Sequence, residues 1–595
     1  MIDLSDKKAR GRVLRAIKDS REKLEPYRKV RKELLKDYVG SWYSEDGAEN
    51  KTLVNLMNQT ARIYTIALAA ENPAVLVSTP RQEHLPFARR FETNLNKMIE
   101  DMKLDKTFRQ IVLDAFFCIG IGVTMMRDSG TKFHGMLESE EDVWLDPGEP
   151  WFNRVSLDDA ILDMSAKEIS KMRFCGHRFR ADFEKVQSEP QYDKKVLKQL
   201  KPTTKSQSET EVRADEIGQS FEVDDDELKP MIWLQNVYIA ENNSIATMAC
   251  DIDLPPLLEV DWAGSQGGPY KYLSLGDVPD NIIPVSPAHN LKGMHDMQNR
   301  LHRRMEADSD AHKVVNAYPP AGADDAEKIR NAGRNDWVRV GDPNGIKTVE
   351  VGGVDQRDLA LSSFIQQEYD RFAGNLQAMG GLGAQSATVG QEELIQGGVA
   401  RNEADMRMAV VQFASESILD LGRLMWEDSE LEIRSSMQVG NTGIEVNSDW
   451  TPDNRVGNFE DYRFRVEPYS MVFKTPDQKL AELYETLQQL APLWPMLQPS
   501  GASLDGAAIV EEIARLKNRP EFKRFITFAA PADMLGGDQN TIRQSPVTSR
   551  ETVRKNVPTG GTQENQANIL QQVLMGNSSP QVNGQQAASM GRSPV

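Results

Sequence analysis

The residues best suited to metal chemistry are four histidines in one stretch of the chain. His289, His295, His302 and His312 fall on one predicted long helix, and the seven-residue spacing of His295 and His302 places both on the same face. Imidazole nitrogens bind Zn²⁺, so this spacing permits a metal site. Surface or interface polar positions fit these residues better, because the seven histidines form no His-Glu-x-x-His motif.

Two acidic runs offer a second kind of metal chemistry, that of a nuclease. Glu138–Asp142 and Asp224–Glu227 could supply metal-binding carboxylates. Both runs lie in predicted loops and have no accompanying histidine or lysine pattern. Solvated surface runs explain them better, and no metal or other cofactor is expected.

The glycine-rich segments differ from the loops that bind nucleotides. The loop at Gly380, Gly381 and Gly383 lacks the lysine of a phosphate-binding P-loop. Gly120-x-Gly122 continues to Met125 where a dinucleotide-binding motif has its third glycine. The sequence also has no Gly-x-Ser-x-Gly nucleophile elbow. These observations predict a structural protein rather than an enzyme.

Length and composition set the class of protein that must position these residues. The chain has 595 residues, of which 39% are hydrophobic and 27% charged, and this length suggests three or four substructures. The longest apolar stretch, Ile111–Met126, contains Asp114 and is too short to cross a bilayer. The N-terminus is charged, unlike a secretory signal. Three widely spaced cysteines provide no disulfide framework. We therefore expect a soluble protein of a reducing compartment, with no membrane segment.

Charge is distributed unevenly along the chain. Residues 1–37 hold 13 basic and 7 acidic side chains, which gives this segment a net charge of +6. Since the whole chain has a net charge of −19, the remaining residues carry −25. Such an acidic body repels phosphate and is unsuited to wrapping nucleic acid tightly. The basic N-terminal helix is expected to bind an acidic neighbour such as another copy of the chain, and the alternative is a solvated helix face. The predicted subunit-interface residues are Arg12, Arg15, Arg28 and Arg31.

Hydrophobic periodicity predicts a mixed α/β first half. Helices are expected over residues 5–38, 51–70, 87–102 and 106–118, and strands over 121–126, 231–240 and 245–252. Pro26 is expected to kink or divide the first helix. The polar, acidic segment 186–230 is predicted to be a flexible insertion.

The second half is predicted to contain long helices around a small α/β segment. Helices are expected over residues 288–314, 356–378, 391–427, 476–490 and 504–516, and strands over 337–340, 346–351, 462–466 and 471–473. Paired Gly397 and Gly398 should kink the third of these helices. Residues 531–595 are rich in Gln, Asn and Ser and are predicted to be largely disordered.

This order of elements resembles that of the portal proteins (head-to-tail connectors) of tailed bacteriophages, over about residues 10–530. Individual segments are similar in style as well. They are IYTIALAAENPAVLVSTP, FRQIVLDAFFCIGIGVTMM, EPWFNRVSLDDAILDMSA, DNIIPVSPAHNLKGMHDMQNRL, SATVGQEELIQGGVARNEADMRMAVVQF and YRFRVEPYSMVFKTPDQKLAEL. The third departs from the family pattern, with Met164 where proline is usual. The six segments occur in the family's order.

The resemblance implies a mixed α+β, predominantly helical portal fold that assembles into a dodecameric ring with a central channel. It divides the chain into a wing (1–283 and 392–475), stem helices (284–314 and 355–378), a clip (315–354), a tunnel loop (379–391) and a crown (476–530). The tunnel loop would constrict the channel through Gly381, Gly383, Gln385, Ser386, Thr388 and Gln391. The clip would dock partners through Asp325, Lys328, Arg330, Arg334, Trp337 and Asp342.

The resemblance also implies partners and location. The partners would be other copies of the chain, the major capsid protein and scaffold, the terminase large subunit, head–tail adaptor and tail proteins, and double-stranded DNA passing without sequence specificity. The protein would occupy one capsid vertex of the virion, after assembly in the host cytoplasm. Two alternatives remain, namely another virion connector, adaptor or scaffold protein, and a packaging motor or nuclease.

Overall fold

A computed structural model describes fourteen segments of the chain. They are residues 2–40, 54–69, 71–128, 133–136, 142–145, 148–202, 229–250, 252–342, 344–374, 389–438, 445–467, 470–471, 476–494 and 506–517. Helix and strand are mixed, with helix the larger share. None of the helices within these segments is long and apolar enough to cross a membrane.

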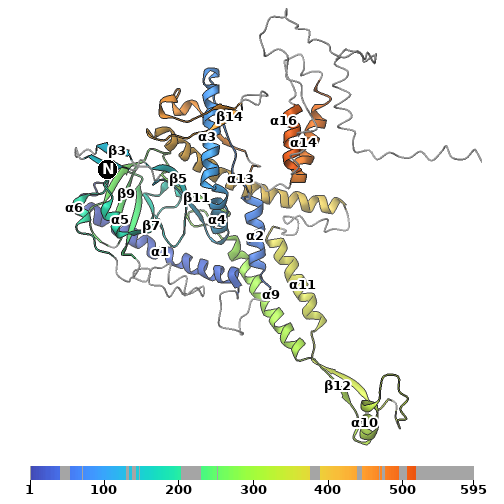
Figure 1. The fold of residues 1–595 in the computed structure, drawn as a ribbon. Helices are drawn as coiled ribbons and strands as arrows, with labels where there is room; N and C mark the ends of the chain where they lie inside the picture. Colours follow the sequence, from blue (N-terminus) through green and yellow to red (C-terminus); the bar gives the residue numbers. More distant parts are fainter. Residues whose placement is uncertain are drawn as a thin grey trace, which may run out of the picture. The chain divides into compact units, whose positions relative to one another are not determined.

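The chain divides into two compact units (Figure 1). The first comprises Met1–Met437 and Glu445–Phe473, and the second comprises Gln438–Ile444 and Lys474–Val595. The helices of the first unit are α1 (Lys7–Val39), α2 (Leu56–Leu68), α3 (Leu85–Met102), α4 (Leu104–Phe117), α5 (Phe183–Ser188), α6 (Lys194–Leu197), α9 (Pro287–Asp310), α10 (Ala323–Asn331), α11 (Gln356–Phe372) and α13 (Val389–Glu427). In the second unit, α14 (Pro476–Leu490) packs against α16 (Gly506–Leu516).

In the described segments, strands form one large sheet, one smaller sheet and several pairs. The strands are β1 (Val75–Ser78), β2 (Gly120–Arg127), β3 (Phe133–Met136), β4 (Asp142–Leu145), β5 (Glu149–Val155), β6 (Ala160–Leu162), β7 (Phe174–Asp182), β8 (Met231–Ile239), β9 (Ser244–Ala249), β10 (Leu258–Asp261), β11 (Tyr270–Leu273), β12 (Lys313–Ala317), β13 (Lys347–Val351), β14 (Ser436–Gln438), β15 (Glu445–Asn447) and β16 (Arg463–Val466). The five-stranded sheet has the order β10-β9-β8-β7-β6, and the three-stranded sheet has the order β11-β2-β5.

The main core joins segments that are far apart in sequence. On α3, Phe87 and Phe91 are one turn apart and bury the same face. They pack against Trp426 at the end of α13 and against Trp450, whose ring centroid lies 4.7 Å from that of Phe91. Strand β16 then pairs with β1, with Val466 opposite Val75. These contacts fold the chain after residue 400 back onto its first hundred residues.

Two glycines set the packing of β2. A Cβ at Gly120 would lie 2.5 Å from the carbonyl oxygen of Ile111 in α4, and one at Gly122 would lie 2.2 Å from the ring of Phe152 in β5. Only glycine permits such close approach. The Gly-x-Gly pair therefore serves the fold rather than a nucleotide.

Helix α1 crosses the sheets as one continuous element. Its Val13 and Ile17 pack on Val237 and Ile239 of β8, and Leu24 is fully buried in a neighbouring apolar cluster. Pro26 lies inside this helix. Division of the helix at Pro26, one of the two predicted outcomes, is therefore wrong.

The predicted insertion at 186–230 is wrong in its first part. Val186 of α5, Val196 and Leu197 of α6, and Leu200 are buried against Ile232 and Leu234 of β8. These apolar side chains anchor residues 183–200 to the sheet. Residues 203–228, which include the acidic run Asp224–Glu227, lie outside the described segments.

Candidate assembly and docking module

Helix α9, part of the predicted first stem helix, begins with a cap that ties it to α4. The Ser286 hydroxyl accepts a hydrogen bond from the amide of His289 (3.1 Å) and donates one to the carbonyl oxygen of Phe116 (3.0 Å). Pro287 occupies the first turn, where a backbone N–H is not needed. Two turns further on, Lys292 pairs with Asp37 of α1 at 2.7 Å. The start of α9 is therefore held from two sides.

Helix α11, part of the predicted second stem helix, is held by tyrosine hydroxyls at its other end. Tyr369 is fully buried, and its hydroxyl lies 2.9 Å from the Thr60 hydroxyl of α2. The Tyr64 hydroxyl donates to the carbonyl oxygen of Ala373 at 3.1 Å. Burial raises the pKa of Tyr64 to about 12, so this hydroxyl stays protonated and remains a donor.

Between these anchors, α9 and α11 meet through a small apolar cluster and one polar layer. The cluster contains Leu301, Met305 and Ile365. In the polar layer the Gln298 amide donates to the Ser362 hydroxyl at 2.8 Å and lies 3.1 Å from Nε2 of His302. The layer gives the two helices a defined register with little apolar contact.

The helix histidines do not form a metal centre in the described part of the chain. His289, His295 and His302 lie on α9, and His312 follows it. Burial lowers the pKa of His295, which favours its neutral form. Among the described residues, no group of three His, Cys, Asp or Glu side chains is placed to hold a metal ion.

The segment that joins α9 to α11 buries none of its residues in its regular elements. Strands β12 and β13 pair antiparallel, with Lys313 opposite Val351 and Ala317 opposite Lys347, and every residue of both strands is exposed. Helix α10 also buries no side chain. In Figure 1 this ribbon and α10 continue from the ends of α9 and α11. An isolated two-stranded ribbon is at best marginally stable in water, so exposure on both faces is unusual for such a ribbon.

One strand predicted from the sequence of this segment is wrong. Residues 337–340 were predicted to form a strand, but they contain none, and β13 pairs with β12. A glycine pair closes the resulting ribbon. Gly352 and Gly353 have φ angles of 80° and 107°, and a Cβ at Gly352 would lie 2.9 Å from the carbonyl oxygen of Ala311. Glycine is needed at this turn.

The six predicted docking residues all lie on this module, but they are not equivalent. Asp325 accepts a hydrogen bond from the amide of Gly341 (2.7 Å) and pairs with Lys328 (3.3 Å), so these two side chains stabilise the module itself. The amide of Gly341 is the main cause of the lowered pKa of Asp325. Trp337 is completely exposed. The remaining docking residues, also exposed, are Arg330, Arg334 and Asp342.

A second apolar surface lies on α11. Leu361, Phe364 and Phe372 share one side of this helix and are 39%, 58% and 68% exposed. We call these three residues the α11 stripe. The stripe lies beside the face that buries Ile365 and Tyr369. Exposed aromatic side chains in such a row are typical of a surface that another chain covers.

Two of the predicted interface arginines are buried and bind groups of their own chain. Arg28 is 3% exposed and donates to the carbonyl oxygens of Leu157 (3.2 Å) and Ala160 (3.1 Å). Arg31 is 4% exposed and pairs with Asp114 at 2.9 Å and Asp158 at 3.0 Å. The interface prediction for Arg28 and Arg31 is therefore wrong, because both side chains bind groups of their own chain, on α4, on β6 and on the loop before β6.

The other two arginines of this set, Arg12 and Arg15, are exposed. Their role at an interface stays a prediction. The buried pairing of Arg31 was missed, although Leu24, Arg28, Arg31 and Leu34 follow one helical stripe. That spacing was the available signal that the arginines face inward with the leucines.

The predicted channel constriction lies mostly outside the described segments. This applies to Gly381, Gly383, Gln385, Ser386 and Thr388. Gln391 was assigned to the loop, but it belongs to α13, which begins at Val389. Helix α13 is continuous through Gly397 and Gly398, and the kink stays a prediction.

Comparison with known proteins adds no assignment. No model of a protein family matches the sequence, and no curated protein matches it.

Proposed function

We propose that the chain is a portal protein, a structural ring at one capsid vertex through which double-stranded DNA enters and leaves the virion. The proposal depends on residues 287–372, which comprise α9, α11 and the segment between them. Here two anchored helices bracket a ribbon and a helix that bury no side chains of their own. About forty residues between α9 and α11 form a segment without a buried core. Such a segment needs neighbouring copies or partners to cover it.

The surfaces of the first unit support a closed ring. A cyclic assembly needs two different complementary patches on each copy. The α11 stripe offers an apolar patch, and the exposed basic residues Arg12 and Arg15 could face the acidic body of a neighbour. The polar layer around Gln298 lets α9 and α11 keep their register while their outer faces contact other copies.

Net charge supports DNA passage rather than DNA binding. Each phosphate contact adds affinity by releasing counterions, so a basic channel would retain DNA. The net charge of −19 and the Gly, Gln, Ser and Thr residues of 379–391 favour weak, replaceable contacts. On this proposal the exposed Trp337 and the charged residues around it dock the packaging motor and later the adaptor and tail proteins.

The native mass of the purified protein tests the proposal. About twelve copies of a 66.8 kDa chain weigh on the order of 800 kDa, and negative-stain images should show a central hole. Phe364→Ala should weaken the assembly, whereas Gln366→Ala, an exposed polar neighbour on the same helix, should leave it unchanged. A stable dimer or a filament would contradict the ring.

Two alternatives are separated by simple measurements. A stable dimer or a filament would favour an adaptor or scaffold protein, which would not need two anchored helices around a coreless ribbon. A packaging motor or nuclease would hydrolyse ATP or cut DNA, so an ATPase assay and a DNA-cleavage assay on the purified chain distinguish it from a portal protein.

A further inference from the structure

A cavity of about 550 Å³ lies along helix α1, where this helix crosses the five-stranded sheet. Residues between 14 and 28 of α1 form most of its lining, and the rest comes from Gln235 of β8 and from Ile252 and Asp253 after β9. We call this cavity the α1 groove. Fourteen residues of helix rise about 21 Å, so a cavity of this volume is long and narrow. It suits an extended chain of about six residues better than a compact ligand.

Gln235 faces the α1 groove from the sheet. It precedes Val237 and Ile239 on the same face of β8, and those two side chains pack against α1. Gln235 is 3% exposed, and its side-chain amide makes no hydrogen bond to another described residue. Nearly all buried polar groups have a hydrogen-bond partner. A buried amide that lacks one beside a cavity indicates a ligand with both a donor and an acceptor.

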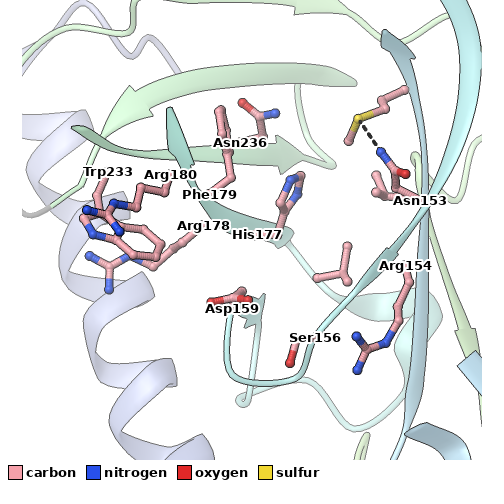
Figure 2. Close-up of a pocket in the computed structure, with 13 residues that line it drawn as sticks. Asn153, Arg154, Ser156, Asp159, His177, Arg178, Phe179, Arg180, Trp233 and Asn236 are labelled. Carbon is pink, nitrogen blue, oxygen red and sulfur yellow. Dashed lines mark hydrogen bonds between the residues drawn. The ribbon is translucent and has the colours of Figure 1, made fainter. Parts of the chain in front are cut away.

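A second cavity, of about 420 Å³, differs from the α1 groove in this respect. It is lined by residues of both larger sheets, and Figure 2 shows Asn153 and His177 on opposite walls. Asn153 donates to the sulfur of Met125 at 3.6 Å, and Nδ1 of His177 lies 2.8 Å from the hydroxyl of Tyr270. These two side chains therefore need no ligand, whereas the Gln235 amide has no such partner.

The chain itself shows twice what an amide side chain can hold. Asn96 accepts a hydrogen bond from the amide of Val75 and donates one to the carbonyl oxygen of the same residue, both at 2.9 Å. Asn299 binds the two main-chain groups of Val54 in the same way, at 3.0 and 3.1 Å. The N–H and C=O of one extended residue point to the same side of the chain, so one amide can bind both.

The other walls of the α1 groove combine apolar and charged side chains. Leu14, Ile17 and Ile252 provide apolar surface, and Ile252 is 43% exposed. Lys18 and Glu22 are exposed, and neither forms an ion pair with another described residue. The remaining charged residues of the lining have partners within the chain. The free groups are therefore one amide, one cation and one anion beside an apolar floor.

We propose that the α1 groove binds an extended segment of a partner protein, and that the Gln235 amide bonds to the N–H and C=O of one residue of that segment. Alternate side chains of an extended chain are about 7 Å apart, close to the rise of about 6 Å from Lys18 to Glu22. An apolar side chain of the segment would cover Leu14 and Ile17. The next two side chains on that side, one acidic and one basic, would pair with Lys18 and Glu22. The groove lies outside residues 287–372, and the inference does not depend on ring assembly.

The test uses the full chain and a fluorescein-labelled peptide of the sequence Leu-Ala-Asp-Ala-Lys. Fluorescence anisotropy should show saturable binding with a Kd below about 1 mM. The same peptide with serine in place of leucine should bind about tenfold more weakly, because it covers less apolar surface.

Two substitutions in the groove test the amide and the apolar floor separately. Gln235→Leu removes the amide at similar volume and should raise the Kd about tenfold. Its thermal midpoint should not fall, because this amide has no partner in the free chain. Ile252→Ser removes exposed apolar surface and should raise the Kd about threefold. Gln199→Leu, at an exposed position just after α6, is the matched control and should leave the Kd unchanged.

Three results would overturn the proposal. The first is no saturable binding of the peptide to the folded wild-type chain up to about 1 mM peptide. The second is an equal Kd for the wild type and Gln235→Leu, which would place the peptide elsewhere. The third is a lower native mass of Gln235→Leu, which would assign the groove to a second copy of the chain.

Discussion

Arg31→Met is expected to lower the free energy of unfolding of the chain by about 3–5 kcal/mol, the usual cost of removing one partner from a buried ion pair. Arg31 bridges Asp114 on α4 and Asp158 before β6, at 2.9 and 3.0 Å. The side chains of these aspartates are only 6% and 2% exposed. Arg154 also pairs with Asp114, so Asp114 keeps one cationic partner when Arg31 is replaced.

Urea unfolding followed by tryptophan fluorescence measures this loss. With a slope of roughly 3 kcal/mol per M, the midpoint should fall by about 1 M or more. Lys29→Met is the matched control, because it removes one positive charge from an exposed position of the same helix that the interface prediction does not include. Its effect should stay within about 0.5 kcal/mol. The double variant Arg31→Met with Asp158→Leu should recover part of the loss, since it removes both charges.

The urea midpoint and the native mass together separate a role inside the chain from a role between copies. If Arg31→Met unfolds at the same urea concentration as the wild type while the native mass falls, Arg31 acts at a subunit interface. That result would refute the inference that this buried arginine binds groups of its own chain. If the midpoint falls and the surviving folded protein assembles normally, the arginine belongs to the fold.

Four further outcomes are expected. Burial lowers the pKa of His177 to about 4, below its ordinary value of 6.5. Between these two pH values the unfolded chain binds a proton at this residue that the folded chain does not. The free energy of unfolding therefore falls as pH falls through this range. His177→Gln should reduce that fall, as measured by urea midpoints at pH 7 and pH 5, and an unchanged difference would contradict it. Trp337→Ala should leave the native mass unchanged and weaken binding of the packaging motor in a pull-down with purified components. Replacing Gln385 and Thr388 by lysine should slow DNA packaging at low salt, and equal packaging rates would count against a constriction there. Deletion of residues 535–595 should leave assembly intact by light scattering.

Local sequence signals predicted the long helices and several strands well, whereas the short helices α5, α6 and α10 were not predicted. Helix α14 has the predicted bounds, Pro476–Leu490, because proline favours the first position of a helix. Strand β2 was expected at 121–126 and spans Gly120–Arg127. These elements have their own hydrophobic periodicity and their own start and stop residues, so a short window of sequence suffices to place them.

Elements that depend on distant partners were missed or misplaced. Strand β7 was not predicted, because it pairs with β8, which lies beyond residue 230, and its residues show no simple alternation of burial. Arg31 was assigned to the surface because its acidic partners lie 83 and 127 residues away. Composition reports how many charges a segment has, and only the fold determines which of them are paired.

The segment between α9 and α11 shows that burial, too, cannot be predicted from the apolar pattern of a strand. Val315 of β12 lies opposite Val349 of β13, so Val315, Val349 and Val351 share one face of the ribbon, yet both faces are exposed in the single chain. An exposed apolar face of this kind is typical of a surface that another chain covers. A mutation such as Val315→Ser should then change the native mass far more than the urea midpoint of the dissociated chain. Equal effects on both would mean that the ribbon stabilises its own chain instead.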